Sequence, residues 1–185
     1  MSEQFGVLWL RKPRQSRNAR LPIATSRKAG RLEGWRRVWR GTHLRKVAYL
    51  SVEQDKNCTL HGLIAQVHAD DWTALDAREA AYQRHDVSHL ISHDGRALNT
   101  AVYQVEPHHI ADTEGHPILL SYLDVVVQGY LREFGKAGVA HFFETTTGWH
   151  APILNDRANP IYPRHQQLSA TQMALVDEHL SAVVK

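Results

Sequence analysis

The positions of the apolar residues predict several strands in the first half of the chain. An apolar run from Phe5 to Leu10 has no polar alternation and therefore predicts a strand buried on both faces. The polar residues 53–57 predict a turn between two further strands. The strands on either side of this turn are expected at about residues 47–52 and 59–67. Three more strands are expected at about residues 32–40, 82–87 and 100–105.

The second half of the chain has helical periodicity. Apolar residues recur every three to four positions from Ile118 to Phe134, and Gly135 predicts the end of that helix. A second helix is expected at about residues 136–144. Three prolines make residues 149–168 an irregular tail segment, and a capping-box signature predicts a last helix over residues 169–183.

A short helix is expected between the strands at 59–67 and 82–87, because Asp70 and Asp71 are good N-cap residues. On its 3.6-residue period Glu79 shares one face with three core-type side chains, and an unpaired buried carboxylate is costly. Glu79 is therefore expected to have either a partner or a task. In the alternative interpretation Glu79 is a surface acid and the inward face consists of Ala74, Ala77 and Ala81.

Composition limits the classes of protein. The single cysteine, Cys58, excludes an intrachain disulfide framework and is typical of a cytoplasmic protein. No apolar run has the roughly 18 residues that a membrane span needs. The 185 residues predict one domain.

Charge is distributed unevenly along the chain. Residues 1–46 hold thirteen Lys and Arg against two acids, whereas the remaining residues hold nine against seventeen. Residues 11–30 are polar and basic and are expected to form a loop. Such a basic segment can bind nucleic acid or another acidic partner. The alternation of Trp and Arg around Trp35 and Trp39 suits base stacking, but a buried strand face with Arg stems over its edge is the favoured interpretation.

Two motifs in this order resemble those of a known family. A strand is followed by Leu75-Asp76-x-x-Glu79 and then by Tyr82-x-Arg84, and the tail carries Gly148-Trp149-x-Ala151-Pro152-Ile153-Leu154-Asn155-Asp156-Arg157. This pattern resembles the γ-glutamylcyclotransferase-like superfamily, in particular its bacterial γ-glutamylcyclotransferase and ChaC-like branch. The resemblance implies an α+β fold, with a small mixed β-barrel or a strongly curved sheet flanked by helices, as a single domain over residues 1–185.

The resemblance also implies an activity. Enzymes of this family release 5-oxoproline from a γ-glutamyl amide or peptide, as in glutathione metabolism, and Glu79 matches their catalytic acid/base. Phe5, Gly6, Val7 and Leu8 match the turn that holds the γ-glutamyl group through backbone N–H groups. Val7 stands where Ser is expected, which either retunes the site or abolishes the activity.

Other residues are assigned roles on the same basis. Tyr122 matches a substrate-orienting tyrosine, although its place on an apolar helical stripe suits core packing equally well. Asp156 and Arg157 are expected to take part in a buried Asp–Arg pair that anchors the tail. His85, His89 and His93 are four residues apart, but residues 85–93 are expected to form a strand and turn, where this spacing does not make a helical metal site, so neither a metal nor a cofactor is expected.

Two functions of different class follow. The favoured one is a cytoplasmic γ-glutamylcyclotransferase that acts on a small molecule, with neither membrane nor nucleic acid as the expected partner. The alternative is a non-catalytic member of the fold that binds nucleic acid or an acidic partner through its basic N-terminal segment.

Overall fold

The computed structural model describes residues 5–9, 27–67, 71–92 and 99–184, and for residues 5–9, Arg27 and Ser92 it describes the backbone alone. The chain divides into two units, the first with residues 1–36 and 52–106 and the second with residues 37–51 and 107–185. Two long strands, β2 (Arg27–Thr42) and β3 (Arg45–Val67), contribute residues to both units. That the chain is a single domain stays a prediction.

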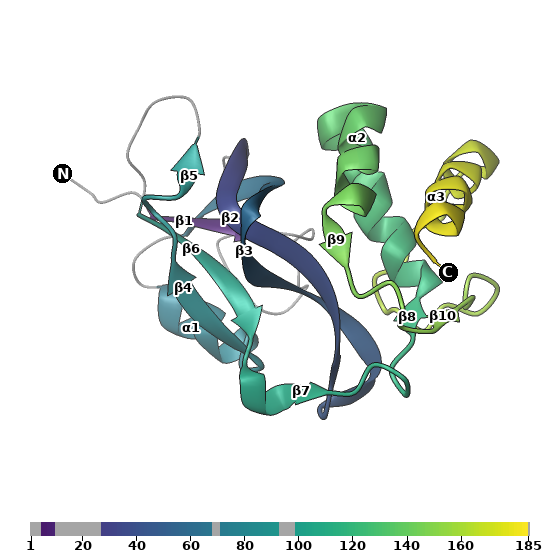
Figure 1. The fold of residues 1–185 in the computed structure, drawn as a ribbon, viewed down its shortest axis with the longest axis horizontal. Coiled ribbons are helices and arrows are strands. Elements are labelled where there is room, and N and C mark those ends of the chain that lie inside the picture. The colour runs from purple at the N-terminus through teal and green to yellow at the C-terminus, as the bar shows by residue number, and fades with distance from the viewer. Residues whose placement is uncertain (1–4, 10–26, 68–70, 93–98, 185) are drawn as a thin grey trace. The chain divides into compact units, whose positions relative to one another are not determined.

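The first unit is built on a mixed sheet (Figure 1). Its strands follow the order β4-β6-β1-β3-β2-β5. Strand β1 is antiparallel to β3 and parallel to β6, so it is the central strand that its apolar run predicts. The remaining strands of this unit are β4 (Tyr82–Asp86), β5 (Ile91–Ser92) and β6 (Asn99–Val105), and its helix is α1 (Trp72–Arg78).

Strand β3 differs from the prediction, because the expected turn at residues 53–57 does not interrupt it. The stretch contains neither glycine nor proline, and Asp55 forms an ion pair with Arg36 of β2, which holds this polar segment along the sheet. Residues 27–30, which were expected to end the basic loop, belong to β2, and residues 11–26 lie outside the described part of the chain.

The core of the first unit confirms the strand interpretation of the tryptophan-rich segment. Trp35 is buried in an aliphatic cluster, and its ring also meets that of His85. Such a side chain is not available for stacking on nucleic-acid bases. A second cluster seats α1 on the sheet and consists of Val67, Leu75 and Tyr103, with Trp72 and Tyr82 beside it. Asp71 occupies the N-cap of α1, but its side chain makes no capping hydrogen bond, and Asp70 is not described.

The second unit consists of two helices and short strands. Helix α2 (Leu120–Glu144) and helix α3 (Ala170–Val183) are its long elements. Arg37 of β2 is fully buried here, where its guanidinium donates to the hydroxyls of Tyr130 and Thr145 and lies 4.9 Å from the centre of the Tyr130 ring. The shorter elements are η2 (Pro107–His109), β7 (Ile110–Ala111), β8 (Ile118–Leu119), β9 (Thr146–Thr147) and β10 (Ile153–Leu154).

The tail is irregular, as predicted, and two acid groups anchor it. The Asp156 carboxylate accepts hydrogen bonds from the N–H and hydroxyl of Ser121 and from the N–H of Ile161. Burial alone would raise the pKa of Asp156, but these donors lower it. Arg157 forms the expected Asp–Arg pair with Asp124 of α2, at 2.7 and 2.8 Å, rather than with its neighbour.

These elements confirm the α+β class. Within the described residues the mixed sheet is not closed into a barrel, so the strongly curved sheet is the alternative that fits. None of the helices in the described ranges is long and apolar enough to cross a membrane. The capping box of α3 is present, with Ser169 and Gln172 bonded to each other's backbone N–H.

The predicted helix end at Gly135 is the kink at which two helical segments join within α2, so the second segment is the helix expected after it. Gly135 has φ 66° and ψ −167°, a conformation that residues with a Cβ essentially never adopt.

We expect Gly135→Ala to lower the free energy of unfolding by about 1–3 kcal/mol, measured by urea denaturation. Gly129→Ala is the matched control, because Gly129 lies in the regular part of α2 with open space around its Cα. That control should be neutral or stabilising by up to about 1 kcal/mol. Equal losses in both variants would contradict the assigned strain.

Candidate active site

Glu79 ends helix α1 as a buried carboxylate. Its N–H donates to the Leu75 carbonyl at 2.9 Å, and the residue is only 6% exposed. The guanidinium of Arg78 donates to Oε1 through Nε at 3.1 Å and Nη2 at 2.8 Å. A cation beside the carboxylate offsets much of the cost of its burial. Glu79 therefore has the partner that its position in the sequence requires.

The adjoining strands fix where Glu79 lies on the sheet. Strand β4 begins at Tyr82, whose N–H donates to the Glu79 carbonyl at 2.7 Å. Tyr82 pairs with Val105, the last residue of β6, and the next N–H, that of Glu106, donates to Ala81. Glu79 thus lies beyond the edge of the sheet at which β4 starts and β6 ends.

Strand β1 runs towards the same edge. It is parallel to β6, with Val7 paired to Ala101, and parallel strands present their carboxyl ends at one edge. Continued along β6, this register brings Trp9 level with Tyr103, two residues or about 7 Å short of Val105. The sequence therefore brings the end of β1 and Glu79 to one edge of the sheet, although seventy residues separate them.

The turn expected at Gly6 is not present, because Gly6 lies inside strand β1. Residues 5–9 form a strand that pairs with β3 along its whole length, and residues 5–7 also pair with β6. The cause is that the ladder satisfies the backbone groups of this stretch, so Gly6 belongs to the sheet rather than to a binding loop. The roles of Phe5, Gly6, Val7 and Leu8 in substrate binding stay predictions.

A network of polar side chains fixes α1 against the sheet. Asp76 accepts a hydrogen bond from the Tyr103 hydroxyl at 2.5 Å and forms an ion pair with Arg84 at 3.1 Å. The Arg84 guanidinium also lies 4.5 Å from the centre of the Trp72 ring. Burial, and then the Asp76 carboxylate, raise the pKa of Tyr103 well above its usual range, so its hydroxyl keeps its proton and donates. This network orients α1 and thereby the residue that ends it, Glu79.

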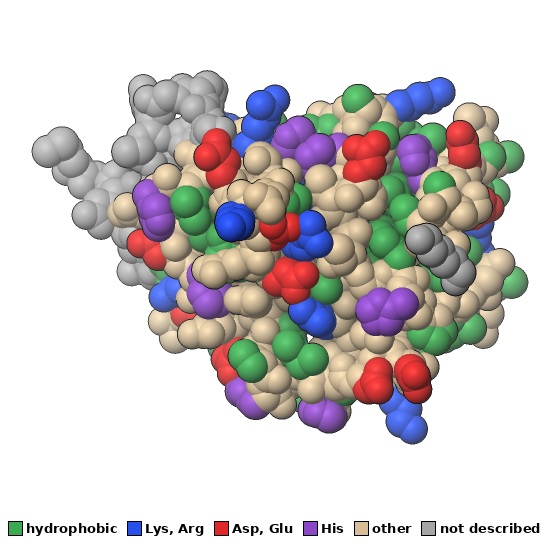
Figure 2. Space-filling model, in the orientation of Figure 1, with side chains coloured by type: hydrophobic (Ala, Val, Ile, Leu, Met, Phe, Trp, Pro, Cys, Tyr) green, Lys and Arg blue, Asp and Glu red, His purple; other side chains and the backbone are tan. Residues whose placement is uncertain are grey.

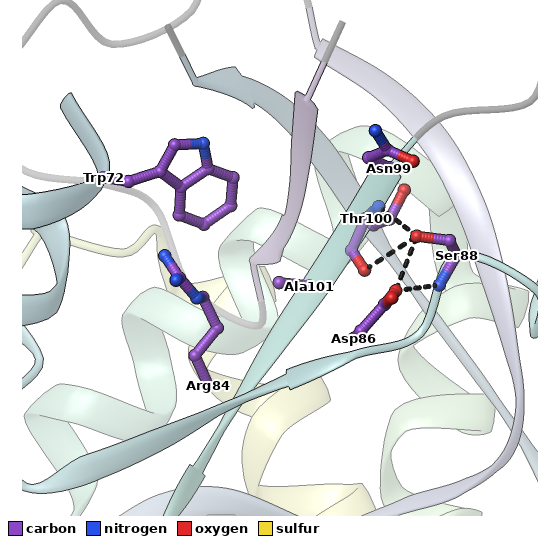
Figure 3. A pocket seen from close by; sticks show the side chains of 7 residues that line it. All are labelled: Trp72, Arg84, Asp86, Ser88, Asn99, Thr100 and Ala101. Carbon is purple, nitrogen blue, oxygen red and sulfur yellow. Dashed lines mark hydrogen bonds between the residues drawn. The ribbon is translucent and has the colours of Figure 1, made fainter. Parts of the chain in front are cut away.

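A pocket of about 600 Å³ opens beside the network (Figure 3). Glu79 is not among the residues that line it. Along β4 the pocket extends from Arg84, two residues or about 7 Å from Tyr82, to Asp86, four residues or about 13 Å from it. Among the described residues, its lining consists of Trp72, Arg84, Asp86, Ser88, Asn99, Thr100 and Ala101.

Asp86 is held in its charged form in this pocket. Its Oδ1 accepts hydrogen bonds from the Ser88 hydroxyl at 2.6 Å and from the Ser88 N–H at 2.9 Å, and these lower its pKa. The Ser88 oxygen in turn accepts a bond from the Thr100 N–H at 2.8 Å. The carboxylate is therefore both ionised and fixed in orientation.

Tyr122 belongs to the second unit. It is buried, and its ring lies 5.7 Å from that of Trp39 and 4.8 Å from that of Tyr162, measured between ring centres. These contacts are those of a core residue. Its role in orienting a substrate stays a prediction.

The surface drawn in Figure 2 mixes charges of both signs. On that face Lys and Arg side chains alternate with acidic and histidine side chains, and the described residues form no broad basic area there. A nucleic-acid-binding surface would gather one sign of charge.

The comparisons with known proteins decide the family. A family model described as "Gamma-glutamyl cyclotransferase, AIG2-like" matches residues 6–133. The chain belongs to this family. The match includes α1 and Glu79, and it supports the superfamily without specifying the ChaC-like branch. No curated protein matches the sequence.

Solved structures show the same fold at low sequence identity. A structure named "Gamma-glutamyl cyclotransferase" has a TM-score of 0.60 and 12% identity, and the match covers 95% of this chain and 99% of that one. An uncharacterized human protein, loc79017, has a TM-score of 0.58 and 14% identity over 95% of this chain and 99% of its own. YkqA from Bacillus subtilis has a TM-score of 0.57 and 13% identity over 78% of this chain and 56% of its own.

The hydrogen bonds from Ser88 to Asp86 predict that the pKa of Asp86 changes when Ser88 is substituted. We expect Ser88→Ala to raise the pKa of Asp86 towards its ordinary value, because one of two donors to the carboxylate is lost. Since the folded pKa is the lower one, the stability that this contact contributes is present above about pH 4 and is lost as the pH falls through the folded pKa. Carboxyl-carbon NMR titration measures the pKa, with Ser181→Ala of α3 as the control. An unchanged titration of Asp86 in Ser88→Ala would contradict the assignment.

Proposed function

We propose that this member of the family releases 5-oxoproline from a γ-glutamyl amide or peptide, with Glu79 as the general acid/base. The α-amine of the γ-glutamyl group attacks its own γ-carbonyl carbon, the new C–N bond closes the five-membered ring, and the amide C–N bond breaks. The amine loses a proton and the leaving nitrogen gains one. A single carboxylate can carry that proton from one nitrogen to the other.

The observation that carries the proposal is the position of Glu79. It is a buried carboxylate at the edge towards which β1 runs, in a chain whose match to the family includes it. Because nucleophile and electrophile belong to one molecule, catalysis requires mainly that the cyclising conformation be held and the proton be moved. Glu79 needs a fixed orientation for this, and Arg78 at Oε1 supplies it.

The oxyanion that forms at the γ-carbonyl needs donors in fixed positions. Since residues 5–9 form a ladder strand, we place these donors at the end of β1 rather than at Gly6. Among the four proposed substrate residues of β1, Leu8 lies nearest to the Glu79 edge, and Phe5 is level with Asn99 at the far end of β6.

The decisive variant is Glu79→Gln, which keeps the size of the side chain but cannot carry the proton. We expect turnover to fall by a factor on the order of 10² or more, measured as 5-oxoproline released from γ-glutamyl dipeptides and from glutathione. The melting temperature should change little, because Arg78 is 25% exposed and can be solvated once its partner is neutral. Glu144→Gln, an exposed acid at the end of α2, is the matched control and should leave both quantities unchanged.

The structural alternative gives the opposite pattern. If Glu79 served only as the partner of Arg78, Glu79→Gln would melt earlier and would release 5-oxoproline at the wild-type rate per folded molecule. That result would end the case for Glu79 as the catalyst.

Val7→Ser tests the departure from the family's pattern. If the valine limits activity, the serine variant should release 5-oxoproline faster than the wild type at equal concentrations of folded protein. Val7 pairs with Ala65 and Ala101 in the ladder, so the backbone position is fixed and the comparison reports on the side chain alone. An equal or lower rate in the variant would show that a serine hydroxyl is not needed at this position.

A further inference from the structure

Two opposite charges project from one strand into the pocket. Arg84 and Asp86 are two residues apart on β4, so their side chains lie on the same face with Cα atoms about 7 Å apart. Ala101 pairs with Asp86 across the ladder, and its small side chain leaves space between the two charges. Figure 3 shows Arg84 and Asp86 on either side of Ala101.

Arg84 and Asp86 are each held in place by other residues and not by each other. Arg84 is fixed by Asp76 and by the Trp72 ring, and its side chain is still 40% exposed. Asp86 is fixed by Ser88, whose two hydrogen bonds both go to Oδ1. Within the described part of the chain Arg84 and Asp86 form no ion pair with each other. A cation and an anion are thus both oriented in advance and both accessible from the pocket.

We propose that this pocket binds a small zwitterion, an amino acid or a dipeptide, with its carboxylate on Arg84 and its ammonium group on Asp86. Planar guanidinium groups bind carboxylates in a bidentate manner, and an ammonium group donates to an oriented carboxylate. Asn99 also lines the pocket, and its amide can both donate to and accept from a peptide bond. The volume of about 600 Å³ leaves room for both residues of a dipeptide.

Ligands with one sign of charge fit less well. A simple anion that approaches Arg84 meets the Asp86 carboxylate, and a simple cation at Asp86 meets the guanidinium. 5-Oxoproline carries a carboxylate but its nitrogen is a neutral lactam, so it can satisfy Arg84 but not Asp86. The product of the proposed reaction is therefore not the ligand that this site fits best. The binding proposal does not depend on catalysis at Glu79.

The test is a titration of the isotope-labelled protein with glycylglycine, followed by NMR. We expect saturable shifts of the Ser88 and Thr100 amide signals with a Kd of about 1 mM or tighter. The N-acetylated dipeptide, the dipeptide amide and 5-oxoproline each lack one charge and should bind at least about tenfold more weakly. No saturable shift with glycylglycine at concentrations on the order of 10 mM would overturn the proposal. Equal binding of the capped dipeptides would overturn it as well.

Variants locate the site. Asp86→Asn keeps the shape of an exposed side chain and should weaken binding of glycylglycine at least about tenfold, and Arg84→Gln should do the same. Should Arg84→Gln fail to fold, since Arg84 also holds Asp76, the Asp86→Asn result decides by itself. Arg132→Gln and Glu133→Gln alter an exposed ion pair on α2 and are the matched controls, which should bind as the wild type does. Unchanged binding in Asp86→Asn would refute the site.

The same titration in Glu79→Gln separates this proposal from the proposed function. Binding with an unchanged Kd is expected, because Glu79 is not among the described residues that line the pocket. Loss of binding in Glu79→Gln would show that the pocket is not an independent site. Absence of 5-oxoproline release in the wild type would leave the binding result unaffected.

Discussion

The arrangement of the first unit depends on the parallel pairing of β1 with β6. Parallel neighbours must be joined by a long connection, and here that connection contains β2 to β5 and α1. Because β1 is in the centre of the sheet, its position sets the register of β3 on one side and of β6 on the other. Strand β4 pairs with β6, and Glu79 precedes β4. The arrangement in which β1 runs towards the edge that Glu79 lies beyond therefore exists only if this one pairing forms.

Arg84 links that edge to the pocket. It pairs with Asp76 of α1, covers the Trp72 ring and forms one wall of the pocket. Each exposed ion pair contributes little by itself, but the buried hydroxyl of Tyr103 also depends on Asp76, so the network acts as a unit. Helix α1 has only seven residues and little stability of its own, and it therefore needs this tertiary support. The orientation of Glu79 and the shape of the pocket thus have a common cause.

Features determined by nearby residues could be predicted from the sequence, and those determined by distant pairs could not. The central place of β1, the kink at Gly135 and the capping box at Ser169 each follow from a few neighbouring residues. The continuity of β3 depends on the ion pair of Asp55 with Arg36, and Arg157 of the tail pairs with Asp124 of α2. The motif located Glu79, but the pocket arises from the register of β4 on β6, to which a single sequence gives no direct signal.

The separation of the two candidate sites limits what one ligand can do. Along the ladder, Asp86 lies four residues of β4, about 13 Å, beyond Tyr82, whereas Arg84 lies two residues, about 7 Å, beyond it. Three extended residues span only about 10 Å. A γ-glutamyl amide of one amino acid is shorter than the separation of Asp86 from Tyr82. The proposal for Glu79 and the proposal for Arg84 and Asp86 therefore concern different positions along β4, and each is tested by its own measurement.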